Sequence, residues 1–274
     1  MRFFVYFTFT CMVMSCSEFL PYEQNEHSYI LESINGFEVK LDTQLDPESK
    51  ELIIDMVESM VYVEGGCFLM GKNAGRISDI PSHYVRVSDY YICKFELTHQ
   101  SYNTIMNTNR KYLSRDDWQF FIEYVNKSTG LIFDFPTEAQ WEYAAKGGKL
   151  TKGYLYSGSN DLNEVRCASL PCSSNCVANE LGLFDMSGGV SEWCRDSYAE
   201  YEPFYCVDPC VKYGEDCVVR GGSYLSYDET SRFNERVDVY FCEEDFRMCE
   251  TTSRMRAPKD RVSKTIGCRL VINL

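Results

Sequence analysis

The sequence has few histidines and a deficit of positive charge. His27, His83 and His99 are the only histidines in 274 residues, which nearly excludes a site built from a cluster of histidines. The 27 Lys and Arg residues are outnumbered by 41 Asp and Glu, and the formal net charge is −14. Nucleic-acid binding needs a basic surface that neutralises phosphates. A nucleic-acid partner is therefore excluded.

Cysteine and aromatic residues, in contrast, are plentiful. The chain contains 14 Cys, 20 Tyr, 17 Phe and 3 Trp, and 45% of its residues are hydrophobic. This composition is that of a globular chain able to bury a core, so wholesale disorder is not expected. No internal repeat or low-complexity run interrupts it.

The N-terminus has the layout of an export signal. In residues 1–15, Arg2 precedes an apolar run that ends in a small residue, which is typical of a secretory signal peptide and too short for a stable membrane span. The segment Val13-Met14-Ser15-Cys16 resembles a bacterial lipobox. It predicts that Cys16 carries the lipid of an exported lipoprotein, in the periplasm or at the outer membrane or cell surface. The alternative is a plain signal peptide with Cys16 as an ordinary thiol.

Export would place the other cysteines in an oxidising compartment, where disulfides form. We therefore expect a disulfide-rich protein. Six cysteines that crowd a loop-like region are the main candidates for bridges: Cys167, Cys172, Cys176, Cys206, Cys210 and Cys217. Two CxxxC pairs among them resemble half a zinc site, but no histidine lies near to complete one. Cys67, Cys93 and Cys268 fall on strand-like patterns and are expected to be buried small hydrophobes.

Periodicity predicts an α+β fold with few short elements and long loops. Residues 16–59 are interpreted as a polar tether that ends in a short helix from 46 to 59, and residues 60–274 as the folded domain. Strands are expected within 60–71, on either side of a Gly-Gly turn, within 83–98 and at 268–272. Further helices are expected at 98–107, 116–127 and 137–146. The last of these begins with the capping box formed by Thr137 and Gln140.

Six sequence blocks in a fixed order carry a family resemblance. They are MVYVEGGCFLMG, PSHYVRVSDYYICKFELTHQSY, FPTEAQWEYAAKGG, ELGLFDMSGGVSEW, VVRGGSY and IGCRL. Together they resemble the formylglycine-generating (sulfatase-modifying factor) family over residues 60–274. The resemblance implies an α+β fold related to C-type lectins. It also implies a possible activity, which is the oxidation of a sulfatase cysteine to formylglycine by copper held on two cysteines.

The resemblance gives two answers about the copper ligands. Counting forward from the GGSY block, the two cysteine positions of the family are occupied by Ser231 and Arg236, which cannot hold a soft monovalent copper. Counting backward from IGCRL places Cys249 near a catalytic position, with Cys242 as its partner but at a different spacing. Cys242 and Cys249 are therefore either structural cysteines, in disulfides, or the ligands of a redox site.

The block from Leu181 to Trp193 is implied by the resemblance to be a calcium turn. Glu192 would supply its carboxylate, and Gly188 and Val190 their backbone oxygens, a donor set that suits a hard cation. The alternative is that Glu192 pairs within the core while the glycines only make the turn. Asn160, Asp161 and Asn163 lie where a second calcium loop would fall, although such clusters are more often plain turns.

Aromatic residues divide in the same way between packing and binding. Trp141, Trp193, Tyr143 and Phe184 match core positions of the family. Others lie on loop-like segments, where they either contact a partner or fill the core: Tyr154, Tyr156, Tyr198, Tyr201, Phe204, Tyr205 and Tyr213.

Two functions are therefore expected from the sequence. The favoured one is a non-catalytic, exported lipoprotein whose domain, stabilised by disulfides and by calcium, binds a protein or glycan of the cell envelope. The alternative is a copper-dependent formylglycine-generating oxidase that uses Cys242 and Cys249. An iron-dependent sulfoxide synthase of related fold would need a histidine triad, which the sequence lacks.

Overall fold

A computed structural model describes residues 28–74, 77–166, 176–223 and 246–274. In chain order the elements are β1 (Tyr29–Ile34), β2 (Phe37–Asp42), α1 (Pro47–Glu58), β3 (Met60–Val63), β4 (Gly66–Met70), η1 (Ile77–Asp79), β5 (His83–Val87), β6 (Tyr90–Cys93), α2 (His99–Ile105), α3 (Arg115–Thr129), β7 (Phe133–Asp134), α4 (Glu138–Ala145), η2 (Gly148–Leu150), α5 (Leu162–Val165), β8 (Ser191–Ser197), β9 (Cys206–Val207), β10 (Asp216–Arg220), η4 (Phe246–Cys249), β11 (Met255–Pro258), β12 (Ile266–Gly267) and β13 (Val271–Asn273). Short strands, short helices and long connections confirm the α+β prediction.

The predicted tether contains a folded β-hairpin. Strands β1 and β2 pair antiparallel around a turn in which Asn35 and Gly36 both have positive φ, as a two-residue hairpin turn requires. Val39 and Leu41 project from β2 into the hydrophobic core that the hairpin shares with helices α1 to α3, which we call the first core. Both side chains are fully buried. The polar composition of this segment concealed the alternation that buries one side of the hairpin. The interpretation of residues 16–59 as tether and helix is therefore wrong for 29–42.

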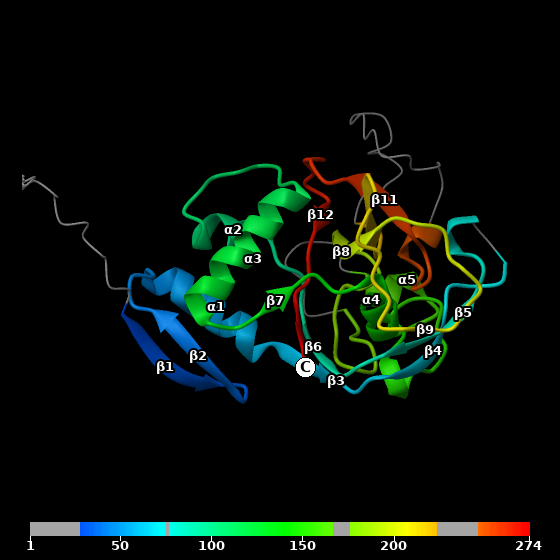
Figure 1. Cartoon of the computed structure of the whole chain (residues 1–274), viewed down its shortest axis with the longest axis horizontal. Coiled ribbons are helices and arrows are strands. Elements are labelled where there is room, and N and C mark those ends of the chain that lie inside the picture. Colours follow the sequence, from blue (N-terminus) through cyan, green and yellow to red (C-terminus); the bar gives the residue numbers. More distant parts are fainter. Residues whose placement is uncertain (1–27, 75–76, 167–175, 224–245) are drawn as a thin grey trace, which may run out of the picture.

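Three helices and this hairpin form one end of the molecule (Figure 1). Helix α1 begins at Asp46, whose side chain accepts the Ser49 N–H, and helix α3 begins with a capping box formed by Ser114 and Asp117. The buried side of α3 packs into the first core with the hairpin and the other two helices. The helices predicted from 46, 98 and 116 are confirmed.

A four-stranded sheet in the order β3-β6-β13-β7 runs through the middle of the molecule (Figure 1). The C-terminal strand β13 lies between β6 and β7, antiparallel to both. Because β3 belongs to this sheet and β4 to another, the expected turn at Gly65 and Gly66 joins two sheets rather than two paired strands.

The second core lies at the other end of the molecule, around α4. The predicted capping box of Thr137 and Gln140 is present and starts this helix. Sheets in the orders β4-β5-β9 and β11-β10-β8-β12 accompany it. Strands β8, β10 and β11 were not expected from the sequence, since the segment after Gly148 shows no clear periodicity.

In the part of the chain that the structure describes, we find no helix with both the length and the apolar character needed to cross a membrane.

Candidate functional site

The glycine turn predicted to bind calcium leads directly into strand β8. Gly188 and Gly189 both have positive φ, at 127° and 61°, so glycine suits the turn at these two positions. A Cβ on Gly189 would also lie 2.5 Å from the carboxylate of Glu96, whose Oε1 accepts the N–H of Val190. Glu96, which is distant from the turn in the sequence, therefore holds the turn in place. No pattern in the sequence indicates this contact.

The side chain of Glu192, on β8, is fully buried and both of its carboxylate oxygens accept hydrogen bonds. The Arg269 guanidinium donates to its Oε1 at 2.8 Å, and the Trp141 indole donates to its Oε2 at 2.7 Å. Arg269 in turn donates to the backbone oxygens of Cys93 and Phe184. This arrangement ties β8 to α4 and to the C-terminal segment.

The paired state of Glu192 does not fit a calcium site. A carboxylate whose two oxygens accept from a guanidinium and an indole has no free oxygen aimed at a cation, and a buried arginine repels one. Among the described residues, moreover, we find no group of three or more His, Cys, Asp or Glu side chains that could hold a metal ion. The calcium site at Glu192, Gly188 and Val190 stays a prediction with no support from the geometry.

A second buried network lies beside the first. Arg220 is completely buried and contacts Glu142 at 2.6 Å and Glu138 at 3.0 Å, and Arg254 donates two hydrogen bonds to Glu138. Burial raises the pKa of Glu142, but Lys146 and Arg220 lower it more, and the net pKa is about 2. These charges are paired with one another, so the network holds α4 and β10 to the segment that leads into β11 rather than offering a reactive group.

Cys249, the described member of the proposed copper pair, is a completely buried free thiol. It packs with Leu162, Val165 and Tyr156, and Gly222 of the GGSY block approaches so closely that a Cβ there would lie 2.6 Å from its Sγ. Burial raises the pKa of the Cys249 thiol to about 12. The expectation of a disulfide at Cys249 is wrong, and Cys242 lies outside the described residues, as do Ser231 and Arg236.

The disulfide-rich prediction is not supported. Eight cysteines in the described ranges are free thiols: Cys67, Cys93, Cys194, Cys206, Cys210, Cys217, Cys249 and Cys268. Cys176 is disulfide-bonded, and none of these eight is its partner, while Cys167 and Cys172 lie outside the described residues. Cys206 and Cys217 belong to different sheets, which sequence spacing could not reveal. Cys93 and Cys268 are buried as predicted, but Cys67 is exposed.

The remaining predicted positions serve the fold. The Asp161 side chain caps α5 by accepting from Asn163, and the Asn160 side chain accepts the Leu155 N–H, which is the behaviour of plain turns. Trp141 and Trp193 are fully buried, as expected of core residues. Three of the loop aromatic residues remain exposed, namely Phe204, Tyr205 and Tyr213.

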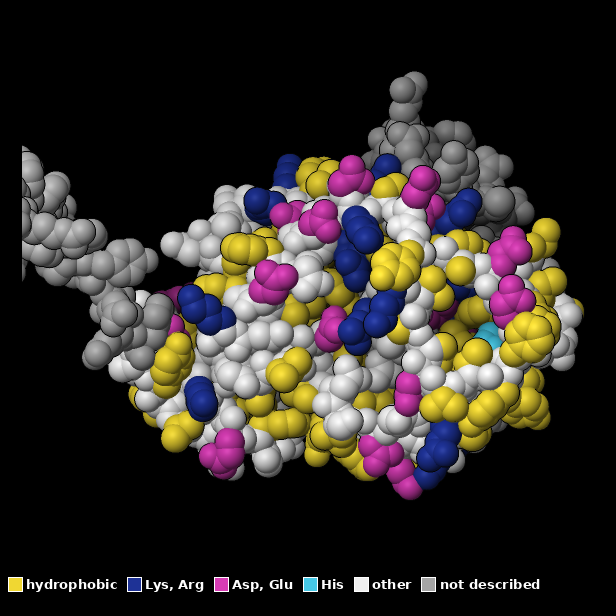
Figure 2. All heavy atoms as spheres, in the orientation of Figure 1, with side chains coloured by type: hydrophobic (Ala, Val, Ile, Leu, Met, Phe, Trp, Pro, Cys, Tyr) yellow, Lys and Arg dark blue, Asp and Glu magenta, His cyan; other side chains and the backbone are white. Residues whose placement is uncertain are grey.

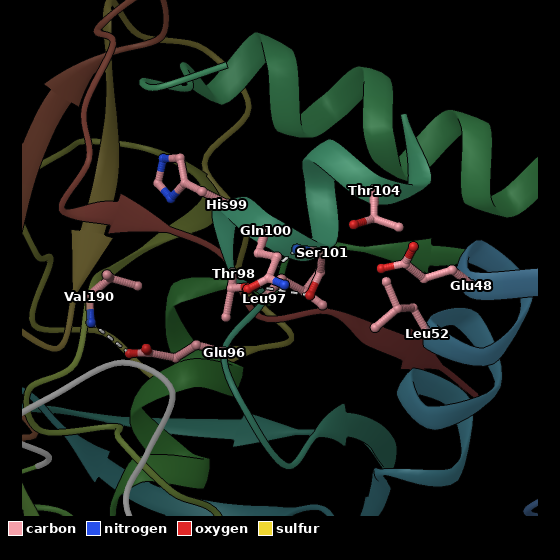
Figure 3. Close-up of a pocket in the computed structure, with 10 residues that line it drawn as sticks. All are labelled: Glu48, Leu52, Glu96, Leu97, Thr98, His99, Gln100, Ser101, Thr104 and Val190. Atoms are coloured by element: carbon pink, nitrogen blue, oxygen red, sulfur yellow. Dashed lines mark hydrogen bonds between the residues drawn. The ribbon is translucent and has the colours of Figure 1, made fainter. Parts of the chain in front are cut away.

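A hollow beside the glycine turn was not anticipated from the sequence. It has a volume of about 470 Å³ and lies between α1, which supplies Glu48 and Leu52, and the start of α2 (Figure 3). Glu96 and Val190 form its other side, so it adjoins the glycine turn. Burial, with a further contribution from the Glu192 carboxylate, raises the pKa of Glu96 well above the usual range.

Comparison with known proteins identifies relatives with different names. "Chaperone protein LppX" of Paenibacillus barcinonensis is 28% identical over 212 residues, which cover 53% of this chain and 74% of that protein. "Serine/threonine-protein kinase Pkn1" of Chlamydia trachomatis is 24% identical over 220 residues, but the match spans only 36% of the kinase's length. "Formylglycine-generating enzyme" of Streptomyces coelicolor is 31% identical over 117 residues, 34% of this chain and 36% of the enzyme.

A solved structure and a family model cover more of the chain. "Treponema denticola variable protein 1" superposes with a TM-score of 0.63 over 89% of this chain and 99% of that one, at 18% identity, which shows a shared fold alone. The family model described as "Sulfatase-modifying factor enzyme 1-like domain" matches residues 46–123 and 111–274. The chain therefore belongs to this sulfatase-modifying factor (formylglycine-generating enzyme) domain family, as the ordered sequence blocks predicted.

Proposed function

We propose that this chain is a non-catalytic member of its family, an exported lipoprotein whose domain binds a protein or glycan partner in the cell envelope. Cys16 would carry the lipid anchor, in the periplasm or at the outer membrane or cell surface. The lipobox-like segment Val13–Cys16 motivates this part of the proposal, and it lies outside the described residues.

The burial of Cys249 is the observation that carries the non-catalytic assignment. Redox chemistry at cysteine requires a thiolate that solvent or substrate can reach. Burial raises the pKa of the Cys249 thiol to about 12, which disfavours the thiolate in the metal-free protein. The close approach of Gly222 leaves no room beside the sulfur on that side. Copper chemistry at Cys242 and Cys249 would need this packing to open.

An exposed apolar sheet surface supports a binding role. On β4, β5 and β9 the side chains of Leu69, Tyr84 and Val207 are 43%, 63% and 57% exposed, and Tyr205 lies beside them. Figure 2 shows hydrophobic side chains gathered at the end of the molecule where these strands lie. Contiguous exposed apolar patches commonly mark interaction sites. The name of the LppX relative, a chaperone, favours a polypeptide partner over a glycan.

Thiol mapping combined with copper titration tests the proposal. The purified full-length protein is treated with iodoacetamide at about pH 8, and the labelled cysteines are identified by mass spectrometry. We expect Cys67, which is exposed, to react rapidly and Cys249 to react only after denaturation. We also expect the native protein to bind no stoichiometric Cu(I) and to leave a sulfatase-derived cysteine peptide unconverted.

Matched variants give this experiment its controls. Cys67→Ser should remove the fast labelling of the peptide that contains position 67, and Cys249→Ser should leave that labelling unchanged. Binding of one Cu(I) per chain, lost in Cys249→Ser and retained in Cys67→Ser, would establish the oxidase alternative instead. Fatty-acid labelling that persists in Cys16→Ala would remove the lipoprotein assignment without affecting the non-catalytic one.

A further inference from the structure

Three adjoining hollows form a groove along helix α1. The hollow described above shares Leu52, Leu97 and Ser101 with a second one of about 490 Å³. It shares Glu48 and Thr104 with a third of about 590 Å³. We call this the α1–α2 groove, and its walls are Glu48, Leu52 and Asp55 of α1 and the facing residues Leu97, Ser101 and Thr104.

The walls of the α1–α2 groove combine apolar surface with unpaired negative charge. Leu52 and Leu97 supply apolar side chains, and Ser101 and Thr104 supply hydroxyl groups. Glu48, Asp55 and Glu58 also border the hollows and are exposed. Among the residues that the structure describes, none of these three carboxylates has an ion-pair partner within 4.0 Å, although other surface carboxylates of the chain do.

The nearby cations are directed elsewhere. Lys50 of α1 pairs with Glu32 of the hairpin at 2.8 Å. Lys94 borders the second hollow, but its ammonium lies over the rings of Phe95 and Phe184, 5.4 Å from each ring centre. Within the described ranges, the groove is therefore left with negative charge along its length that no ion pair neutralises.

We propose that the α1–α2 groove binds an extended, lysine- or arginine-rich polypeptide segment of a partner protein. Its basic side chains would pair with Glu48, Asp55 and Glu58, and its intervening apolar side chains would contact Leu52 and Leu97. The lining of the groove thus indicates which kind of partner the envelope-binding function proposed above would serve. This inference rests on that function.

Shape and charge favour a basic peptide segment over a small organic cation and over a second copy of this chain. A small organic cation would fill one hollow, whereas the negative charges are distributed over all three. A second copy of this chain, with a net charge of −14, would bring predominantly negative surface to a negative groove. A basic extended segment satisfies the charges and the apolar walls of successive hollows together.

Fluorescence anisotropy with a defined peptide tests the inference. The probe is a labelled peptide in which lysine alternates with valine, and its counterpart has glutamate in place of each lysine. Both are titrated with the full-length protein in a neutral detergent. We expect the lysine peptide to bind, the glutamate peptide not to bind, and binding to weaken as salt approaches 1 M, where the screening length is about 3 Å.

Two charge-matched triple variants locate the binding. Glu48→Gln/Asp55→Asn/Glu58→Gln removes the groove charges and should weaken binding about tenfold, since each exposed pair contributes modestly. Glu38→Gln/Glu51→Gln/Asp260→Asn removes three exposed carboxylates outside the hollows and should change binding less than about twofold. All six side chains are exposed, so both variants should fold.

Several results would overturn the inference. Equal weakening by both triple variants would mean general electrostatic attraction, and equal binding of both peptides would mean that charge does not select the partner. Tight binding of lysine amide alone would indicate a small-cation site. Self-association lost only in the groove variant, without peptide binding, would indicate a second copy. None of these results bears on Cys249, so the non-catalytic assignment is tested separately by the thiol and copper measurements.

Discussion

Single residues in this protein owe their roles to their partners rather than to their type. Glu192 has the residue type of a calcium ligand, yet Arg269 and Trp141 donate hydrogen bonds to both of its oxygens. Cys249 has the residue type of a copper ligand, yet burial raises its pKa to about 12. In both cases the environment decides which chemistry the side chain can perform.

Replacing Glu192 by Gln should destabilise the protein by about 3 kcal/mol, because it removes the carboxylate that pairs with the buried Arg269 guanidinium. Urea unfolding of both proteins measures the difference. Glu64→Gln is the control, because its pair with Lys149 is largely exposed and should contribute less than about 1 kcal/mol. Equal losses in the two variants would mean that the buried pair is not a main stabilising contact.

Asp196 should make the protein less stable as the pH rises from about 4 to 6. Burial, with the neighbouring Glu138 charge, raises the pKa of Asp196 from 3.8 to about 6 in the folded state. The folded state then holds a proton that the unfolded state has released, so stability present below about pH 4 is lost as the pH passes the folded pKa. The loss should reach roughly 2 to 3 kcal/mol.

Urea unfolding across this pH range, compared between the wild type and Asp196→Asn, isolates the contribution. The stability difference between the two proteins should change steadily from about pH 4 to 6 and level off above it. A difference that does not vary with pH would show that Asp196 titrates normally.

At the scale of elements, local signals determined helices better than strands. The Thr137 and Gln140 capping box is a short-range pattern, and it starts its helix as predicted. The helix expected from residue 46 is also present, and Asp46 caps its start. Strands β8, β10 and β11 depend on partners far away in the sequence. The side chains of β8 and β10 are buried on both faces, so little alternation remains to reveal these two strands. Strand β11 does alternate between buried and exposed side chains, but it is only four residues long.

The hairpin β1–β2 is part of the core rather than a tether. Leu41→Ala should therefore lower the free energy of unfolding by about 2 to 4 kcal/mol, because Leu41 is only 1% exposed. Glu38→Ala, an exposed position of the same strand, should change it by less than about 0.5 kcal/mol. Equal urea midpoints for the two variants would mean that the hairpin does not contribute to the core.

At the scale of the whole molecule, eight cysteines of the described ranges are free thiols rather than parts of the disulfide framework expected from export. Because at least eight described cysteines are free, Ellman's reagent should detect eight or more thiols in the denatured, unreduced protein. Prior reduction should increase this number only slightly and shift the melting temperature little, since a disulfide-stabilised domain would lose about 2 to 5 kcal/mol. A thiol count well below eight would support the predicted disulfide framework instead. The relation to C-type lectins stays a prediction.

The sequence by itself determined the family, the α+β class and the helix starts, because ordered motifs and capping patterns are local properties of the chain. Its net charge of −14 also predicts that nucleic acid is not a partner, which stays a prediction. Only the tertiary structure decided that Glu192 faces Arg269, that Cys249 lies under Gly222 and that α1 borders a negatively charged groove. These are contacts between segments distant in the sequence, and spacing along the chain does not encode the distances that set charge pairing and burial.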